Sequence, residues 1–173
     1  MTLTDNLKLL DQLVEDHLPE ALRFALRLTG NQESAAEVVQ EALYRAARSV
    51  GTFRGQSQFR TWFYRIVISA FHDSLPASSQ PSSLGELADE LADARNEDPA
   101  TAALTGELRD LIAQRIAALP PRQREVLVLI SYEQLRASEV AEVLGISEAN
   151  VHANLHYARA RLRQELSPYL SET

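Results

Sequence analysis

The chain has 173 residues, 45% of them hydrophobic and 24% charged, and these globular values exclude wholesale disorder. Its net charge of −7 argues against a uniformly basic nucleic-acid binder, although residues 76–103 carry one basic and six acidic side chains and leave the flanking segments nearly neutral. The lack of cysteine excludes disulfides and thiol redox switches within the chain, and the lack of a signal sequence or of an apolar run near the roughly 20 residues of a membrane span predicts a soluble, cytoplasmic protein without membrane insertion.

Residues 1–75 are predicted to form a first helical domain. Apolar side chains recur at helical spacing over residues 7–26, where Pro19 is expected at a break or in a first turn. A second helix is expected to begin at Ser34-Ala35-Ala36-Glu37, which has the pattern of a capping box. A third helix with a wide aromatic face is predicted over residues 59–70. These three helices would enclose one aromatic-rich core.

Residues 76–103 are predicted to be a linker, because Pro and Ser punctuate the segment and its acidic side chains repel one another. Residues 104–173 are predicted to form a second helical domain, whose first helix ends at Pro120-Pro121. Further helices are expected over residues 122–130, 138–144 and 148–166. The predicted fold class is therefore all-α, with two small, independently packed helical domains joined by a flexible linker.

Residues 140–151 meet the requirements of a helix-turn-helix. Ala141 is small where two helices would cross, and Gly145 can adopt the left-handed conformation at the turn. Val151 is expected to pack the second helix back, and Ser147 to cap its first turn. The start of that helix would then lie in a major groove. A helical hairpin that does not bind DNA meets the same packing requirements, so the motif alone leaves both interpretations open.

Four stretches outside this motif carry a resemblance to a known family: Leu22–Gly30, Ala36–Ala42, Phe53–Ile66 and Leu119–Leu127. Over nearly its whole length the chain resembles the extracytoplasmic-function (ECF) sigma factors of the sigma-70 family. The resemblance implies sigma domain 2, a three- or four-helix bundle, at residues 1–75 and sigma domain 4, with its helix-turn-helix, at residues 104–173. It further implies an alternative sigma factor that binds core RNA polymerase and promoter DNA and is controlled by an anti-sigma factor.

In the family, the second helix docks on the clamp coiled coil of the largest polymerase subunit. The matching exposed face here would comprise Glu37, Gln40, Glu41, Tyr44, Arg45 and Arg48. Varied polar groups around an aromatic anchor suit a docking surface. An ordinary solvated face with a Glu41–Arg45 pair explains the same spacing, so only the resemblance favours docking.

The resemblance also implies that the loop before the third helix, together with that helix, opens the minus-10 element and captures a flipped base. The matching residues are Arg54, Gln56, Ser57, Arg60, Thr61, Tyr64 and Arg65. Their polar edges and cations fit the chemistry of a splayed base and its backbone. Phe59, Trp62 and Phe63 share helical spacing and are expected in the core rather than on DNA.

Domain 4 of the family reads the minus-35 element. The matching residues are Arg136, Ser147, Glu148, Asn150, Val151, His152, Asn154, Tyr157, Arg159 and Arg161. Positions that usually hold Lys or Arg are occupied here by His152, Asn154 and Tyr157, and Asp73-Ser74-Leu75-Pro76 replaces an Arg-rich end of the third helix. Fewer cations on both faces predict weaker DNA binding.

Two other function classes stay open. A sigma-like decoy, which titrates an anti-sigma factor without initiating transcription, would explain the loss of cations. A regulator that uses only the helix-turn-helix would bind duplex DNA without polymerase.

No catalytic activity, cofactor or metal site is expected. The sequence has neither a glycine-rich phosphate loop nor a nucleophile motif. His152 and His156 share one helix face, but two neutral-nitrogen ligands without a nearby third are usually surface or packing residues.

Overall fold

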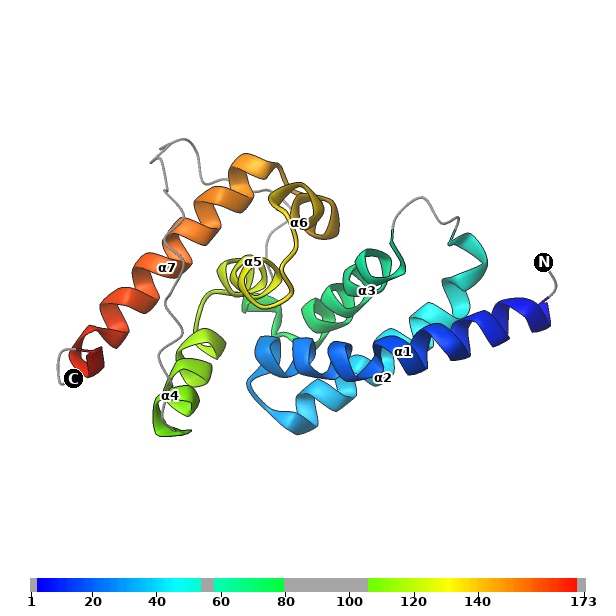
Figure 1. The fold of residues 1–173 in the computed structure, drawn as a ribbon, viewed down its shortest axis with the longest axis horizontal. Coiled ribbons are helices and arrows are strands. Elements are labelled where there is room, and N and C mark those ends of the chain that lie inside the picture. Colours follow the sequence, from blue (N-terminus) through cyan, green and yellow to red (C-terminus); the bar gives the residue numbers. More distant parts are fainter. Residues whose placement is uncertain (1–2, 54–57, 80–105, 171–173) are drawn as a thin grey trace.

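The computed structural model describes residues 3–53, 58–79 and 106–170, and every regular element within these ranges is a helix (Figure 1). The first half contains α1 (Leu3–Thr29), α2 (Gln32–Ser49) and α3 (Phe59–Ser74), with the short 3₁₀ helices η1 (Val50–Thr52) and η2 (Ala77–Ser79). The second half contains α4 (Gly106–Ala117), α5 (Pro121–Ser131), α6 (Ala137–Leu144) and α7 (Glu148–Leu170). The predicted all-α class is confirmed. We call α1–α3 the first module and α4–α7 the second module.

Helix α1 is continuous through Pro19, so the expected break at this residue is wrong. Pro19 itself is exposed, whereas Leu18 packs against the core and Ala21 and Phe24 are fully buried. The buried stripe on both sides of Pro19 compensates for the backbone hydrogen bond that a proline removes from a helix interior.

Helix α2 begins three residues earlier than the sequence pattern suggested. Its N-cap is Asn31, whose side-chain Oδ1 accepts a hydrogen bond from the backbone N–H of Ser34 at 3.0 Å. The predicted cap at Ser34 is therefore wrong, because Asn31, three residues upstream, is an equally good N-cap and places Ser34 inside the first turn.

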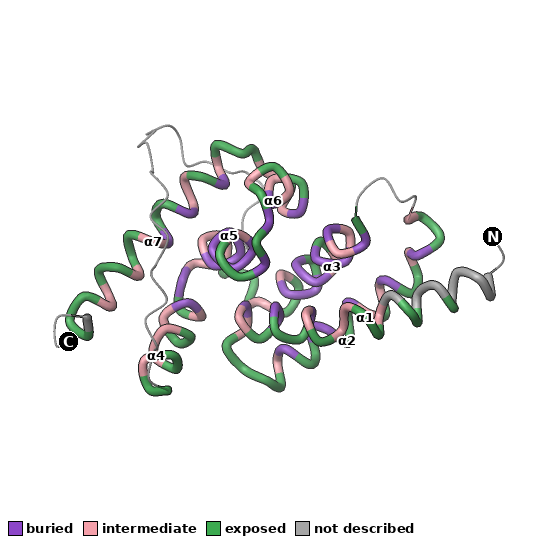
Figure 2. The backbone as a smooth tube through the Cα atoms, in the orientation of Figure 1, coloured by how far each residue is buried: buried purple, intermediate pink, exposed green. Residues whose placement is uncertain are grey.

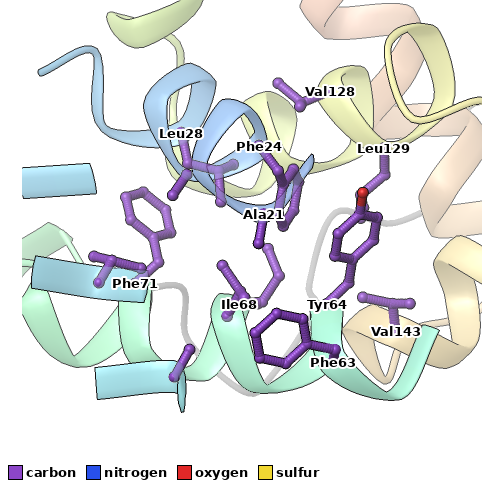
Figure 3. Close-up of a cluster of buried hydrophobic side chains, with 14 of the residues drawn as sticks. Ala21, Phe24, Leu28, Phe63, Tyr64, Ile68, Phe71, Val128, Leu129 and Val143 are labelled. Carbon is purple, nitrogen blue, oxygen red and sulfur yellow. The ribbon is translucent and has the colours of Figure 1, made fainter. Parts of the chain in front are cut away.

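The first module packs its three helices around the aromatic face of α3. Phe63, Val67 and Phe71 are almost completely buried. Phe71 lies beside Leu28 of α1 (Figure 3), and the Phe24 ring of α1 lies 4.5 Å from that of Tyr64. The aromatic-rich core predicted from the sequence is present.

The second module contains the expected helix-turn-helix. Gly145 ends α6 with φ of +65° and ψ of +36°, which is the left-handed conformation predicted for the turn. Val151 and Leu155 of α7 are buried, and α5 carries an uninterrupted buried segment from Arg124 to Leu129. Figure 2 shows that burial concentrates on α3 and α5 and that α7 is largely exposed on its outer side.

The two modules pack against one another along a seam, with α1 and α3 on one side and α4, α5 and α6 on the other. Their buried side chains form one continuous cluster, in which Tyr64 of α3 faces Leu129 of α5 and Val143 of α6 (Figure 3). The cores are therefore joined rather than independently packed as expected. Of the predicted linker, residues 76–103, the structure describes only residues 76–79, and the remainder lies outside the described residues.

Candidate nucleic-acid and protein interfaces

The six residues predicted to dock on polymerase lie together on the outer face of α2. Tyr44 is 57% exposed at the centre of this face. Arg48 donates a hydrogen bond to the Tyr44 hydroxyl at 2.9 Å and places its guanidinium 5.6 Å from the centre of the Tyr44 ring. Glu37, Gln40 and Glu41 are exposed. The face thus presents one large aromatic side chain within a polar rim, which is the composition of a binding hot spot.

Arg45 is the most constrained member of this face. Its guanidinium contacts the carboxylates of Glu41 and Asp73 at 2.7 Å each and donates to the Ser69 hydroxyl at 3.1 Å. The hydrogen bonds to Glu41 and Asp73 raise the pKa of Arg45. The predicted Glu41–Arg45 pair exists, and Arg45 additionally ties α2 to the end of α3.

The structure divides the residues predicted to contact the minus-10 element. Arg54, Gln56 and Ser57 lie outside the described residues. On α3, Arg60 is half-buried and Arg65 is exposed, whereas Thr61 and Tyr64 are buried at 4% and 1% exposure. Thr61 and Tyr64 are therefore not accessible to DNA in this conformation, because they lie on the side of α3 that packs into the core.

The aromatic residues near the start of α3 belong to the packing, as predicted. Phe53 lies 5.8 Å from Phe59 and 5.2 Å from Trp62, measured between ring centres, and Phe59 lies 5.8 Å from Phe63. Edge-on, tilted and stacked ring contacts of this kind stabilise a core beyond simple area burial.

Glu133 is the centre of a polar cluster at the seam, and only 8% of its side chain is exposed. Tyr64 donates a hydrogen bond to one carboxylate oxygen at 2.5 Å, and Arg27 donates to the other at 3.2 Å. Arg60 lies 3.6 Å from the carboxylate and also donates to the backbone carbonyl of Glu133. All three donors come from the first module, while Glu133 belongs to the second.

The cluster shifts the pKa values of Tyr64 and Arg60. Burial raises the pKa of the Tyr64 phenol, and the hydrogen bond donated to the Glu133 carboxylate raises it further. Burial acts to lower the pKa of Arg60, but Tyr64 and the Glu133 carboxylate outweigh it and the pKa is raised. At neutral pH Tyr64 is therefore a neutral donor and Arg60 is a cation, and the Glu133 carboxylate has the partners that a buried anion requires.

A cavity of about 240 Å³ opens at this point of the seam. It is lined by Glu20, Arg23, Arg27, Arg60, Tyr132, Glu133 and Gln134. Arg27 stacks over the Tyr132 ring at 4.5 Å. Gln134 has φ of +56°, a left-handed conformation that costs a non-glycine residue about 1 kcal/mol, and this turn points Glu133 at the first module.

Further polar contacts cross the seam on both sides of this cluster. Arg65 lies 3.2 Å from the Glu142 carboxylate, an exposed pair between α3 and α6. His72 lies 2.6 Å from the fully buried carboxylate of Glu125, which Arg122 also contacts at 2.9 Å.

Arg124 joins the modules through the backbone. It donates hydrogen bonds to the carbonyl of Leu28 and, at 2.8 Å, to that of Leu119, and burial lowers its pKa. It thereby supplies a donor to one of the last carbonyls of α1, which no intrahelical N–H can reach.

The residues predicted to read the minus-35 element gather at the start of α7 and the turn before it. Ser147, Glu148 and His152 are exposed, and the Ser147 hydroxyl caps the helix by accepting the Asn150 N–H at 3.1 Å. Val151 is fully buried, so its assignment to the groove is wrong: it faces α5 and α6 and supports the motif from within.

The remaining residues predicted to read the minus-35 element differ in exposure and in the hydrogen bonds that they already make. Asn154 donates its side-chain amide to the Asn150 carbonyl at 2.8 Å, Tyr157 is 41% exposed, and Arg161 is exposed. Arg136 precedes α6, where its backbone N–H donates to Glu139 at 2.7 Å, and Arg159 is half-buried. Exposed polar groups thus follow one face of α7 beyond the turn.

Sequence reasoning missed the acidic residues at the seam. Glu133 stands in the polar stretch Ser131-Tyr132-Glu133-Gln134, which is typical of an exposed turn, and Glu142 lies on a helix face without apolar neighbours. The one available signal was their negative charge within a domain expected to attract DNA.

Neither a metal site nor a membrane span emerges from the ranges that the structure describes. No group of three or more His, Asp or Glu side chains among these residues is placed to hold a metal ion. None of the described helices combines the length and apolarity needed to cross a bilayer.

Comparison with known proteins adds an independent line of evidence. Residues 13–79 match the family model described as Sigma-70 region 2, and residues 109–162 match Sigma-70, region 4. The sequence is 30% identical to the RNA polymerase sigma-H factor of Pseudomonas aeruginosa over 94% of this chain and 88% of that protein. It is 31% identical to the ECF RNA polymerase sigma factor SigE of Mycolicibacterium smegmatis over 94% of this chain, but it spans only 63% of that protein.

A solved structure shares the fold. The sigma factor RpoE, crystallised with the anti-sigma factor NepR from Bartonella quintana, superposes with a TM-score of 0.69 at 21% identity, covering 91% of this chain and 96% of that chain.

Proposed function

Because the chain belongs to the ECF sigma factors of the sigma-70 family, we propose that it binds core RNA polymerase and directs promoter-specific initiation of transcription. The observation that carries the proposal is that both promoter-reading modules occur in one chain and in the order that a sigma factor requires. The protein then acts in the cytoplasm beside the polymerase, and it has no catalytic activity of its own.

Each module has a separate task in this proposal. The outer face of α2 docks on polymerase through Tyr44 and its polar rim. The minus-10 element is engaged by Arg54, Gln56, Ser57, Arg60 and Arg65. The exposed start of α7 enters the major groove of the minus-35 element, where Asn150 and His152 offer hydrogen bonds to base edges. An anti-sigma factor controls access to these surfaces, a role supported by the shared fold with RpoE, which was crystallised with NepR.

Run-off transcription tests the proposal directly. Core polymerase and a template carrying the upstream region of the chain's own gene should give a discrete transcript only when this protein is present. Tyr44→Ala should reduce the transcript more than tenfold, because truncating an interface hot spot costs about 2 kcal/mol or more. Tyr169→Ala is the matched control, since Tyr169 is 49% exposed on α7, away from the α2 face. A transcript that does not depend on the protein would contradict the proposal.

The sigma-like decoy is retained as a second candidate because of the charge on the recognition helix. The sequence has no Lys or Arg between Arg136 and Arg159, and the start of α7 exposes Glu148 and His152 instead. Few cations mean few phosphate contacts and weak binding to duplex DNA. Tight binding to an anti-sigma factor without any promoter-specific transcript would favour the decoy, and a gel shift of promoter duplex by the protein alone would favour a polymerase-independent regulator.

A further inference from the structure

We infer that Glu133 and Glu142 act as intramolecular substitutes for promoter phosphates, so that closure of the two modules and binding of the minus-10 strand exclude one another. The inference rests on the proposed function, because it takes Arg60 and Arg65 to be the α3 cations that face nucleic acid. It adds the residues that control when these cations are available.

The pairing of charges across the seam carries the inference. Arg60 and Arg65 are the two arginines of α3, and each contacts a carboxylate of the second module, Glu133 at 3.6 Å and Glu142 at 3.2 Å. A carboxylate offers the same oxygen acceptors to a guanidinium as a phosphate does. Neither arginine can keep its carboxylate partner and give the same donors to a DNA backbone.

Glu133 also holds Tyr64 in place. The 2.5 Å hydrogen bond from the Tyr64 hydroxyl ends on the Glu133 carboxylate, and Tyr64 is 1% exposed beneath the second module. If the modules separate, the Glu133 turn leaves and the polar end of Tyr64 becomes accessible beside Arg60. One movement therefore frees both a cation for the backbone and an aromatic ring for a base.

We call the contacts of Glu133 and Glu142 with α3 the latch, and their chemistry makes closure reversible. A buried ion pair gives little net stability, because the attraction between its charges is offset by the loss of their hydration. In the open form Glu133 is solvated and Arg60 is either solvated or bound to phosphate, so that neither remains buried without a partner. Polymerase and promoter can thus shift the equilibrium by offering better partners.

The test measures single-stranded DNA binding by the free, full-length protein. The probe is a fluorescent DNA strand of about 12 nucleotides with random sequence, a length within the usual site sizes of single-strand binders. The double variant Glu133→Gln, Glu142→Gln should bind this strand about tenfold more tightly than the unaltered protein if closure leaves about a tenth of the molecules competent. Small-angle scattering should show a larger radius of gyration for the variant.

Glu20→Gln is the matched control for the change in local charge. Glu20 lines the same cavity and lies near Arg60, but it belongs to the first module, and its ion pair at 3.8 Å is with His17 of the same helix. It should leave the radius of gyration unchanged and alter strand affinity much less. Arg27→Gln, which removes one donor to Glu133 without changing either carboxylate, should open the protein in the same direction as the double variant.

The outcomes separate the latch from the proposed function. Unchanged strand affinity and unchanged radius of gyration in both the double variant and Arg27→Gln would overturn the latch, even if the protein supports run-off transcription. Equal gains from Glu20→Gln and from the double variant would also overturn it, because charge alone would then explain the effect. If the variants open and bind DNA while no transcript forms with polymerase, the latch stands and the proposed function fails.

Discussion

Tyr64 illustrates how one buried hydroxyl links the two modules. Its folded-state pKa is raised above the value near 10 of a free phenol, so the neutral donor is the form that the folded protein stabilises. The hydrogen bond to Glu133 therefore contributes fully below pH 10 and is lost as the pH rises through the folded-state pKa.

We expect Tyr64→Phe to lower the free energy of unfolding by about 2 kcal/mol at pH 7, because the bond ends on a charged acceptor. Urea unfolding at several pH values should show a constant difference between variant and unaltered protein up to pH 9. Above pH 10 the difference should shrink by up to about 1.4 kcal/mol per pH unit. A difference that persists unchanged at pH 11 would show that the hydroxyl is not the stabilising group.

Val151 and Asn150 are neighbours in sequence with opposite roles. Val151 is fully buried and Asn150 is partly exposed. Val151→Ala should cost about 2 kcal/mol of unfolding free energy through lost burial and the cavity left behind. Asn150→Ala should change stability by less than about 0.5 kcal/mol while weakening promoter binding by the holoenzyme. Thermal unfolding and filter binding measure the two effects, and equal losses of stability would contradict this division.

At the scale of single residues, the sequence predicts which face of a helix is buried better than it predicts the role of each residue on that face. The spacing of Phe59, Phe63 and Val151 correctly indicated packing, yet family resemblance also placed Val151, Thr61 and Tyr64 on DNA. A family resemblance assigns a function to a position in a motif, but it does not say whether the side chain at that position is buried. A polar side chain on the apolar side of a helix fits the sequence pattern equally well whether it packs in the core or contacts DNA. Structure alone distinguishes them.

The helix ends depend on two glycines that adopt left-handed conformations, Gly30 with φ of +71° and Gly145 with φ of +65°. A Cβ at Gly145 would meet open space, whereas a Cβ at Gly30 would lie 2.7 Å from the Cβ of Ala117 in the second module. A substitution at either position forces a side chain into the left-handed backbone conformation, but only a substitution at Gly30 also creates a steric clash across the seam.

Gly145→Ala should therefore lower the unfolding free energy by about 1 kcal/mol and leave the modules closed. Gly30→Ala should cost more and should also increase the radius of gyration, because Ala117 has no flexible side chain to move aside. Paired urea titrations and scattering curves would measure both quantities. Equal stability losses with equal radii would show that α4 does not depend on close contact with the α1–α2 turn.

The ends of helices were predictable where the sequence offers a single residue suited to that position, such as a proline or a glycine. Pro120-Pro121 was predicted to end the first helix of the second domain, and α4 does end just before this pair, at Ala117. Gly145 correctly marked the turn of the helix-turn-helix. The start of α2 was missed because Asn31 and Ser34 both make good caps and the sequence does not say which one is used. Pro19 was misjudged because tertiary burial outweighs the local preference against an interior proline.

The side chains that join the two modules could not be predicted from the sequence. Periodicity shows which helix faces are apolar, but it does not show that the buried faces of α1 and α3 meet those of α5 and α6. The contacts that join them, such as Tyr64 with Glu133, connect residues 69 positions apart through an acidic residue that resembled a surface turn. Long-range pairing of this kind is set by three-dimensional complementarity.

In the whole molecule the two modules are packed together, whereas the proposed function requires them to separate. In the closed form Arg60, Tyr64 and Arg65 are engaged by the second module, while the Tyr44 face of α2 stays exposed. Under the proposed function, polymerase makes its first contact through α2 before the modules separate, and Arg60, Tyr64 and Arg65 become available to the minus-10 strand only afterwards. The start of α7 is exposed already in the closed form.

The distance between the modules in the presence of polymerase tests this account most directly. The chain has no cysteine, so Asp11→Cys and Gln164→Cys, both at exposed positions, allow two spin labels to be attached without background. Pulsed electron–electron double resonance should give one narrow distribution of distances between the two labels in the free protein. A clearly different distribution should appear after core polymerase and promoter DNA are added. An unchanged distribution in a complex that produces transcript would contradict the account.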